Sequence, residues 1–238
     1  MAVLIVASVS FVLIHFLIAG TRVRDRLIAG VGAVTFRIGF SLLVALSLVT
    51  MVIAYSQAEG SPVWGKGESL LPLWVFYLGN FLAFLFLVIG TLTPSPNSLL
   101  SEKAYQRGDV DVSGMLRISR HPGMLGIGLW ALMHLLANGD SASIIFFGAL
   151  AFQALVGPLS MDRKKLRLEG ERYAQIVEQT SYLPFLAMLR SKQGSANQLS
   201  KQSRSVWAEI GYLKLMVAIA VFIGVVFAHP WLAGVAIW

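Results

Sequence analysis

Apolar runs of membrane-spanning length recur along the chain and limit the folds that it can adopt. Six runs are close to the ~20 residues that a helix needs to cross about 30 Å of hydrocarbon. They cover residues 2–20, 34–55, 70–93, 121–138, 141–160 and 211–236. Hydrophobic residues make up 56% of the chain and charged residues only 13%, which excludes an ordinary soluble domain. We therefore predict an all-α fold, a polytopic transmembrane helical bundle of about six spans, with residues 1–238 as a single domain.

The basic residues between the runs predict an orientation. Segments 21–33, 94–120 and 161–210 hold 3, 4 and 9 Lys or Arg residues, whereas the loop over 56–69 holds only Lys66. Because Lys and Arg accumulate in cytoplasmic loops, both termini are predicted to lie outside. The expected location is the bacterial inner (cytoplasmic) membrane, crossed several times. The net charge of +7 favours membrane lipid over nucleic acid as a partner.

Two further segments have local signals. Asn138 and Gly139 are predicted to end the fourth span, and Asp140 or Ser141 to start the fifth, which makes these spans an antiparallel hairpin. Residues 161–185 place apolar side chains at near-helical spacing beneath a basic face, which predicts an amphipathic helix on the inner leaflet.

The polar stretch over residues 191–204 lacks hydrophobic periodicity. Such a composition is typical of a mobile cytoplasmic linker, which here precedes the additional C-terminal span over 211–236.

Histidines inside apolar runs are the main functional candidates, because ionisable groups are costly in a bilayer. His15 and His134 each lie within a span among apolar neighbours, and we favour a cofactor or substrate role for His15 over a histidine bonded across the bundle. His121 follows Arg120 at a helix start, where capping competes with function. His229 fits an interfacial position. Since His121 and His134 are separated by ~20 Å along a helix and by roughly 140° around it, they cannot share one metal ion.

A haem suits two lone histidines on different helices, because its porphyrin supplies four equatorial nitrogens and needs only axial ligands from the protein. The chain has no cysteine, which excludes thiolate ligands and disulfides. Trp130 lies one helical turn from His134, where packing against a haem edge competes with ordinary helix packing.

Two long motifs resemble the NnrU family, which includes bacterial proteins linked to denitrification and nitric oxide metabolism and the zeta-carotene isomerases. The motifs are "RISRHPGMLGIGLWALMHLLANGD" and "DRKKLRLEGERYAQIVEQTSYLPF", and the similarity, which includes the histidine of "IHFLIAGTRVRDRL", covers residues 11–187. In the isomerase branch, the resemblance implies a haem b that is bound by two histidines and whose redox state controls a cis-to-trans rotation of a carotene double bond.

Carried over by position, His15 and His134 match the two haem ligands of that branch, so the expected metal ligands are His15 and His134. Ala131 stands where some isomerases have a cysteine that is proposed to exchange with the second ligand. Counted from the predicted span ends, His15 and His134 lie at different depths, whereas His121 matches the depth of His15. His121 therefore stays as the alternative second ligand.

A weaker resemblance links the Arg120-His121-Pro122 motif to isoprenylcysteine and phospholipid methyltransferases. It implies an S-adenosylmethionine site that includes Arg120, His121, Asp162 and Arg163, although Met124 replaces the usual Tyr and the acidic pair is reduced to Asp162.

The leading functional hypothesis is a haem-b membrane protein that isomerises a carotenoid or another apolar polyene, or that serves nitric oxide metabolism. The alternatives are a methyltransferase that uses S-adenosylmethionine and a non-catalytic assembly or regulatory subunit.

Overall fold

The described part of the chain is built from helices. The computed structural model describes residues 1–64, 69–96, 112–191 and 205–234. One isolated bridge, between Pro62 and Asp140, is the only extended pairing among these residues. The helices are α1 (Ala2–Leu13), the π-helix η1 (Ile14–Ala19), α2 (Arg22–Val31), α3 (Ala33–Ser56), α4 (Leu73–Leu92), α6 (Met115–Ile118), α7 (Pro122–Ala137), α8 (Ser141–Glu169), α9 (Glu171–Gln179), α10 (Leu186–Ser191), α12 (Val206–Ile210) and α13 (Tyr212–Ala233).

Each of the six predicted spans contains one of the long helices. Five of them are long and apolar enough to cross a membrane: α1 with η1, α3, α4, α8 and α13. The fourth predicted span is the shorter apolar helix α7, with 16 residues, which is less than the ~20 that a full crossing needs. The all-helical prediction is thus confirmed for the described residues, which contain five candidate membrane spans; the number of spans and the orientation stay predictions.

The predicted amphipathic helix over 161–185 is wrong in its boundaries. Helix α8 continues without a break to Glu169, because Lys, Arg, Leu and Glu all favour helix and residues 161–169 contain no breaker. Gly170 then turns the chain with φ +56°, a value that favours glycine, and α9 follows as a separate short helix. The predicted linker over 191–204 lies almost wholly outside the described residues.

The chain divides into two compact units. The first comprises Met1–Gly79 and Ile127–Leu168, and the second comprises Asn80–Gly126 and Glu169–Trp238. The C-terminal part of α7 therefore belongs to the first unit, together with α1, α2, α3 and most of α8. Each unit is described by itself below.

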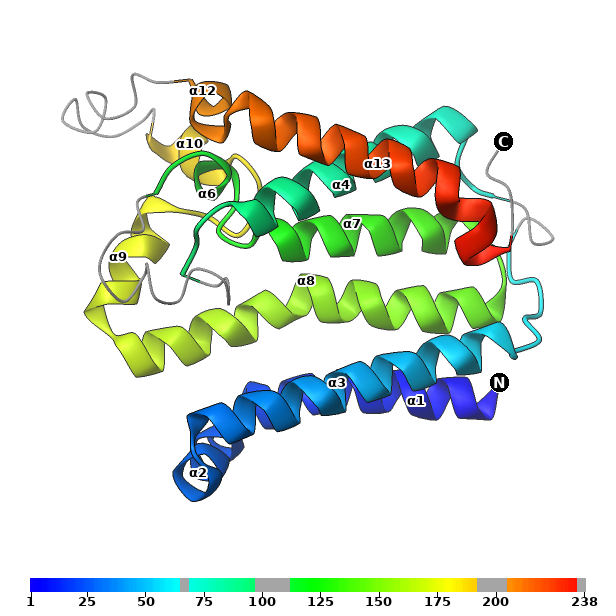
Figure 1. The fold of residues 1–238 in the computed structure, drawn as a ribbon, viewed down its shortest axis with the longest axis horizontal. Helices are drawn as coiled ribbons and strands as arrows, with labels where there is room; N and C mark the ends of the chain where they lie inside the picture. Colours follow the sequence, from blue (N-terminus) through cyan, green and yellow to red (C-terminus); the bar gives the residue numbers. More distant parts are fainter. Residues whose placement is uncertain (65–68, 97–111, 192–204, 235–238) are drawn as a thin grey trace. The chain divides into compact units, whose positions relative to one another are not determined.

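The core of the first unit lies between α1, α3 and α8. Its buried members are Leu4, Ala7, Phe11, Met51, Ala54, Ala142, Phe146 and Phe147. Helices α1 and α8 run in the same direction and α3 runs in the opposite direction (Figure 1). Tyr55, at the end of α3, stacks on Phe146 with 4.5 Å between ring centroids and shares a 2.9 Å hydrogen bond with Ser143. These contacts join the end of α3 to the start of α8.

The predicted hairpin between α7 and α8 is confirmed. The backbone N–H of Ser143 donates to Oδ1 of Asp140 at 2.9 Å, so Asp140 caps the start of α8. A Cβ at Gly139 would lie 2.6 Å from the carbonyl oxygen of Trp64, so only glycine fits there without a shift. The N–H of Val63 donates to the carbonyl of Gly139 at 2.7 Å, which attaches the loop after α3 to this hairpin.

The second unit has a smaller core, formed by Ile89, Met115, Ile118, Ile210 and Ala218. Arg117 and Glu209 form a 2.7 Å ion pair beside it, and Glu209 also accepts a hydrogen bond from the N–H of Gly114. Helix α6 is thereby joined to α12, the short helix that precedes α13.

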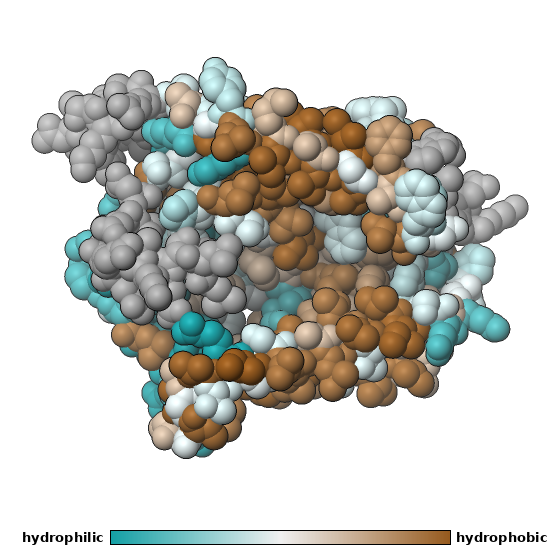
Figure 2. All heavy atoms as spheres, in the orientation of Figure 1, coloured by the Kyte–Doolittle hydropathy of each residue, from teal (hydrophilic) through white to brown (hydrophobic). Residues whose placement is uncertain are grey.

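Much of the apolar surface is exposed, as a bilayer-embedded protein requires. Figure 2 shows brown, hydrophobic side chains over the outer faces of α3 and α13. Leu42 and Leu46 on α3 are 66% and 65% exposed, and Leu213 on α13 is 78% exposed. Helix faces with many exposed large apolar side chains are rare on soluble monomers, because such faces cost free energy in water.

Candidate functional site

His15 lies in the π-helix that continues α1. Its Nδ1 is 2.8 Å from the carbonyl oxygen of Phe11. Because a carbonyl only accepts hydrogen bonds, Nδ1 carries the proton in the neutral ring and the lone pair is on Nε2. The ring packs against Phe11 and Phe40, with centroid distances of 4.6 and 5.9 Å. Single π-helical turns are rare and often occur at functional sites.

His134 has the same local arrangement on α7. Its Nδ1 is 2.9 Å from the carbonyl oxygen of Trp130, so its lone pair is also on Nε2 in the neutral ring. Three aromatic rings surround the imidazole: Trp130 at 4.6 Å, Phe147 at 5.1 Å and Phe76 at 5.2 Å between centroids. Trp130 thus packs against the ring of His134 within α7, and its predicted role beside a haem stays a prediction.

Each of the two imidazoles lies over the preceding turn of its own helix. Side chains on a helix point toward its N-terminus, and each Nδ1 contact places the ring over the preceding turn. Helices α1 and α7 run in opposite directions in Figure 1. The two rings therefore lean in opposite directions along these helices. Phe11, beside His15, and Phe147, beside His134, belong to the same buried cluster.

Arg120 and His121 are buried residues of the second unit, and Arg120 makes a backbone hydrogen bond to the segment after α9. The N–H of Arg120 donates to the carbonyl of Ser181 at 2.7 Å, and its guanidinium donates to the hydroxyl of Thr180 at 3.1 Å. His121 is 2% exposed, and its ring contacts Tyr182 edge-on at 6.2 Å. These contacts give both residues a structural role in joining the start of α7 to the segment after α9.

The residues predicted for a methyl-donor site divide between the two units. Arg120 and His121 are in the second unit, whereas Asp162 and Arg163 are on α8 in the first. Asp162 is buried and the adjacent Arg163 is exposed. The methyl-donor site stays a prediction.

Sequence reasoning missed the aromatic walls of the candidate site. Phe40, Phe76 and Phe147 come from helices far apart in the chain and carry no local motif. It also missed a close approach at the end of η1: a Cβ on Gly20 would lie 2.4 Å from Oγ of Ser160 and 2.6 Å from the carbonyl oxygen of Phe16. An isolated glycine after a span has many explanations, so sequence alone gave no specific signal.

Two apolar grooves border α1. The groove between α1 and α3 has a volume of about 500 Å³, and the groove between α1 and α8 has a volume of about 350 Å³. Ser8 lines the second groove and is 3% exposed. Its Oγ has no hydrogen-bond partner among the described residues. Within those residues, no group of three or more His, Asp or Glu side chains is placed to hold a metal ion.

Comparisons with known proteins agree with one another. The chain is 29% identical over 236 residues to the 15-cis-zeta-carotene isomerase, chloroplastic, of Arabidopsis thaliana, which covers 94% of this chain and 58% of that protein. It is 27% identical over 232 residues to the enzyme of the same name from Zea mays, covering 96% of this chain and 60% of that protein. The chain thus spans about three fifths of the length of these relatives. No solved structure matches it significantly.

A family model described as NnrU protein matches residues 3–237, nearly the whole chain. This chain belongs to the NnrU family.

Proposed function

We propose that this protein is a membrane isomerase that binds haem b through His15 and His134 and acts on a cis double bond of an apolar polyene. The observation that carries the proposal is the matched state of the two histidines. Both are in the first unit, the Nδ1 of each is within hydrogen-bond distance of a backbone carbonyl, and both border one buried apolar cluster. The similarity to two carotene isomerases supports the reaction type.

The residues fit the chemistry that haem requires. Neutral imidazole is the form that binds iron, and a haem needs only two axial ligands from the protein. In metal-bound histidines, the other ring nitrogen usually donates to a carbonyl or carboxylate, which orients the ring. The carbonyls of Phe11 and Trp130 are in the right position for that role. The surrounding phenylalanine rings provide the apolar walls that a porphyrin face prefers.

The chain's own residues would position the reactants and exclude water. Haem b, held by His15 and His134, would supply redox chemistry at a conjugated double bond. Phe11, Phe40, Phe76 and Phe147 pack against the two imidazoles and would shield them from water. The apolar grooves on either side of α1 are suited to a long hydrocarbon chain that enters from the bilayer.

An absorption spectrum tests the haem proposal. The full-length protein, expressed with sufficient haem and purified in detergent, should show the split bands of a six-coordinate reduced haem. His15→Ala and His134→Ala should each remove those bands, because the iron then loses one axial ligand. His229→Ala, a matched change near the end of α13, should leave the spectrum unchanged.

His121→Ala, compared with His134→Ala, separates the two candidate ligand pairs. If His121 is the partner of His15, His121→Ala removes the split bands and His134→Ala does not. A wild-type protein that stays colourless with sufficient haem would overturn the haem proposal. The reaction itself is tested by incubating the reduced protein with 15-cis-zeta-carotene and separating the isomers by chromatography; an unchanged isomer ratio would contradict the isomerase proposal.

A further inference from the structure

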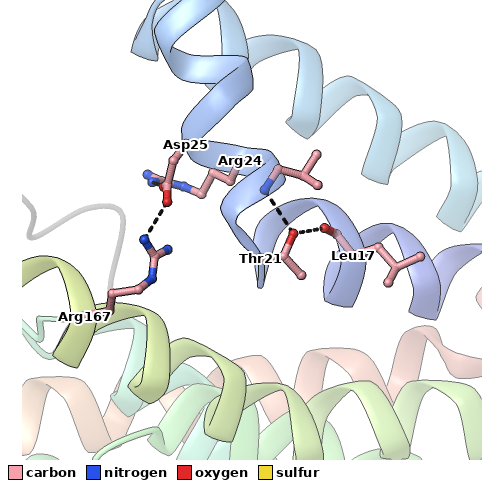
Figure 3. A network of polar contacts seen from close by, with 6 residues as sticks. Leu17, Thr21, Arg24, Asp25 and Arg167 are labelled. Carbon is pink, nitrogen blue, oxygen red and sulfur yellow. Dashed lines mark hydrogen bonds and ion pairs between the residues drawn. The ribbon is translucent and has the colours of Figure 1, made fainter.

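Three cationic side chains lie near the carboxylate of Asp25 in the first unit, at the end of that unit where α2 is located. Arg167, on α8, forms a 2.6 Å ion pair with Asp25, on α2, and Arg24 lies 3.5 Å from the same carboxylate (Figure 3). Lys164, one turn before Arg167, is close enough to interact electrostatically with Arg24, Asp25 and Arg167. Asp25 cannot neutralise all three cations, so this group, here called the α2 cationic cluster, attracts anions.

Asp25 organises the α2 cationic cluster. The hydrogen bond from Arg167 is the main cause that lowers the pKa of Asp25 below its usual value, so the carboxylate stays ionised. Arg24, Asp25 and Arg167 have side chains that are 30%, 31% and 35% exposed, so these three are accessible from outside the protein, and Lys164 is partly buried beside them. The guanidinium of Arg24 also lies over the ring of Phe36, 5.9 Å from its centroid, which keeps it next to the apolar surface of α3.

An exposed apolar stripe on α2 indicates that the bound anion has a hydrocarbon part. Val23, Leu27 and Val31 follow one another at four-residue spacing on α2, and they are 43%, 41% and 54% exposed. Thr21 begins the helix, since its hydroxyl accepts a hydrogen bond from the N–H of Val23 at 3.1 Å. A short helix with a charged face and an exposed apolar stripe is typical of the membrane interface.

The position of α2 in the chain also places this helix at the membrane interface. It connects η1, which ends the first candidate span, to α3, the second. A connection between two spans lies at the level of the lipid headgroups, where phosphate groups and the upper parts of the acyl chains are both within reach. A soluble phosphate would use the cations but not the apolar stripe.

We propose that the α2 cationic cluster is a binding site for an anionic glycerophospholipid. Arg24, Lys164 and Arg167 bind its phosphate, and the stripe of Val23, Leu27 and Val31 contacts its acyl chains. Asp25 holds the two arginines in position and at the same time weakens the binding of the anion. This site does not involve the histidines, so it stands or fails independently of haem binding.

Native mass spectrometry of the full-length protein, purified in detergent and titrated with phosphatidylglycerol or phosphatidylcholine, tests the proposal. Phosphatidylglycerol should bind more tightly than phosphatidylcholine. Lys164→Gln and Arg24→Gln should each weaken phosphatidylglycerol binding by about fivefold, the factor that corresponds to about 1 kcal/mol per basic residue near a membrane surface. Asp25→Asn should act in the opposite direction and strengthen binding, because it removes the competing negative charge and keeps a side-chain oxygen that can accept the hydrogen bond of Arg167.

Arg26→Gln is the matched control, because it removes one positive charge from an exposed position on α2, the helix that also holds Arg24. It should weaken binding less than Arg24→Gln or Lys164→Gln does. Lys164→Gln keeps the ion pair between Asp25 and Arg167. Equal losses in the two variants would show a diffuse charge effect and overturn the site. Equal binding of both lipids would overturn it as well, and so would displacement of phosphatidylglycerol by equimolar inorganic phosphate.

Discussion

Backbone carbonyls determine which ring nitrogen carries the proton in two neutral imidazoles of this protein. Phe11 and Trp130 each supply a carbonyl oxygen to the Nδ1 of the histidine four residues later. The spacing itself is readable from the sequence, because residues four apart share a helix face. The aromatic surroundings of each ring, however, come from other helices and could not be predicted from the spacing.

Gly20, at the end of η1, has no room for a side chain. A Cβ there would meet Oγ of Ser160 and the carbonyl oxygen of Phe16 at distances that force a shift. We expect Gly20→Ala to lower the free energy of unfolding by about 1–3 kcal/mol, the usual cost of overpacking, as measured by thermal unfolding in detergent. The double variant Gly20→Ala/Ser160→Ala should recover only part of the loss, because the backbone contact with Phe16 remains.

Gly30→Ala is the control for this prediction. Gly30 lies within α2, and a Cβ there meets no atom within 4 Å, so alanine should stabilise the helix by up to about 1 kcal/mol. A Gly20→Ala protein as stable as Gly30→Ala would show that η1 accommodates the added methyl group.

At the scale of elements, glycines determine how closely helices of the second unit approach. A Cβ on Gly126 of α7 would lie 2.5 Å from the N atom of Leu87 and 2.6 Å from the carbonyl oxygen of Ala83, both on α4. Small residues let membrane helices pack backbone to backbone, where van der Waals contacts replace the hydrophobic effect as the source of association. The contact of α4 with the first turns of α7 therefore depends on the missing side chain.

Gly126→Ala should separate α4 from α7 and destabilise the protein by about 1–3 kcal/mol. The matched change Gly123→Ala, one turn earlier on the same helix, should cost nothing, because its Cβ would have Oγ1 of Thr91 as its nearest contact, at 3.9 Å. Thermal unfolding of both variants in the same detergent measures the difference. Equal stability of the two variants would contradict the close packing of α4 and α7 at Gly126.

Element boundaries were less predictable than element existence. Long apolar runs located the five long helices, because their length leaves few other structures possible in lipid. The end of α8 was misplaced, since the change from apolar to basic residues at 161 marks the end of the hydrophobic run but not the end of the helix. A helix continues past the membrane surface for as long as its residues favour it, and here a glycine ends it.

For the whole molecule, the exposed apolar faces of the long helices imply that these faces are in contact with lipid and not with water. In each candidate span, the share of the apolar window that is buried inside the protein is between 6% and 33%. A chain expressed in bacteria should therefore stay in the membrane fraction after washes with high salt and alkaline carbonate, and should dissolve only in detergent. Release by carbonate would mean that these helices lie on the membrane surface and do not cross it.

The sequence by itself determined the all-helical membrane architecture, the NnrU family and the histidines worth testing, because hydrophobic length and long ordered motifs are local properties of the chain. Only the tertiary structure decided which aromatic rings surround His15 and His134, and which cations gather around Asp25. Those groups come from segments that are distant in sequence, so their proximity depends on how the helices pack, which no single stretch of the chain encodes.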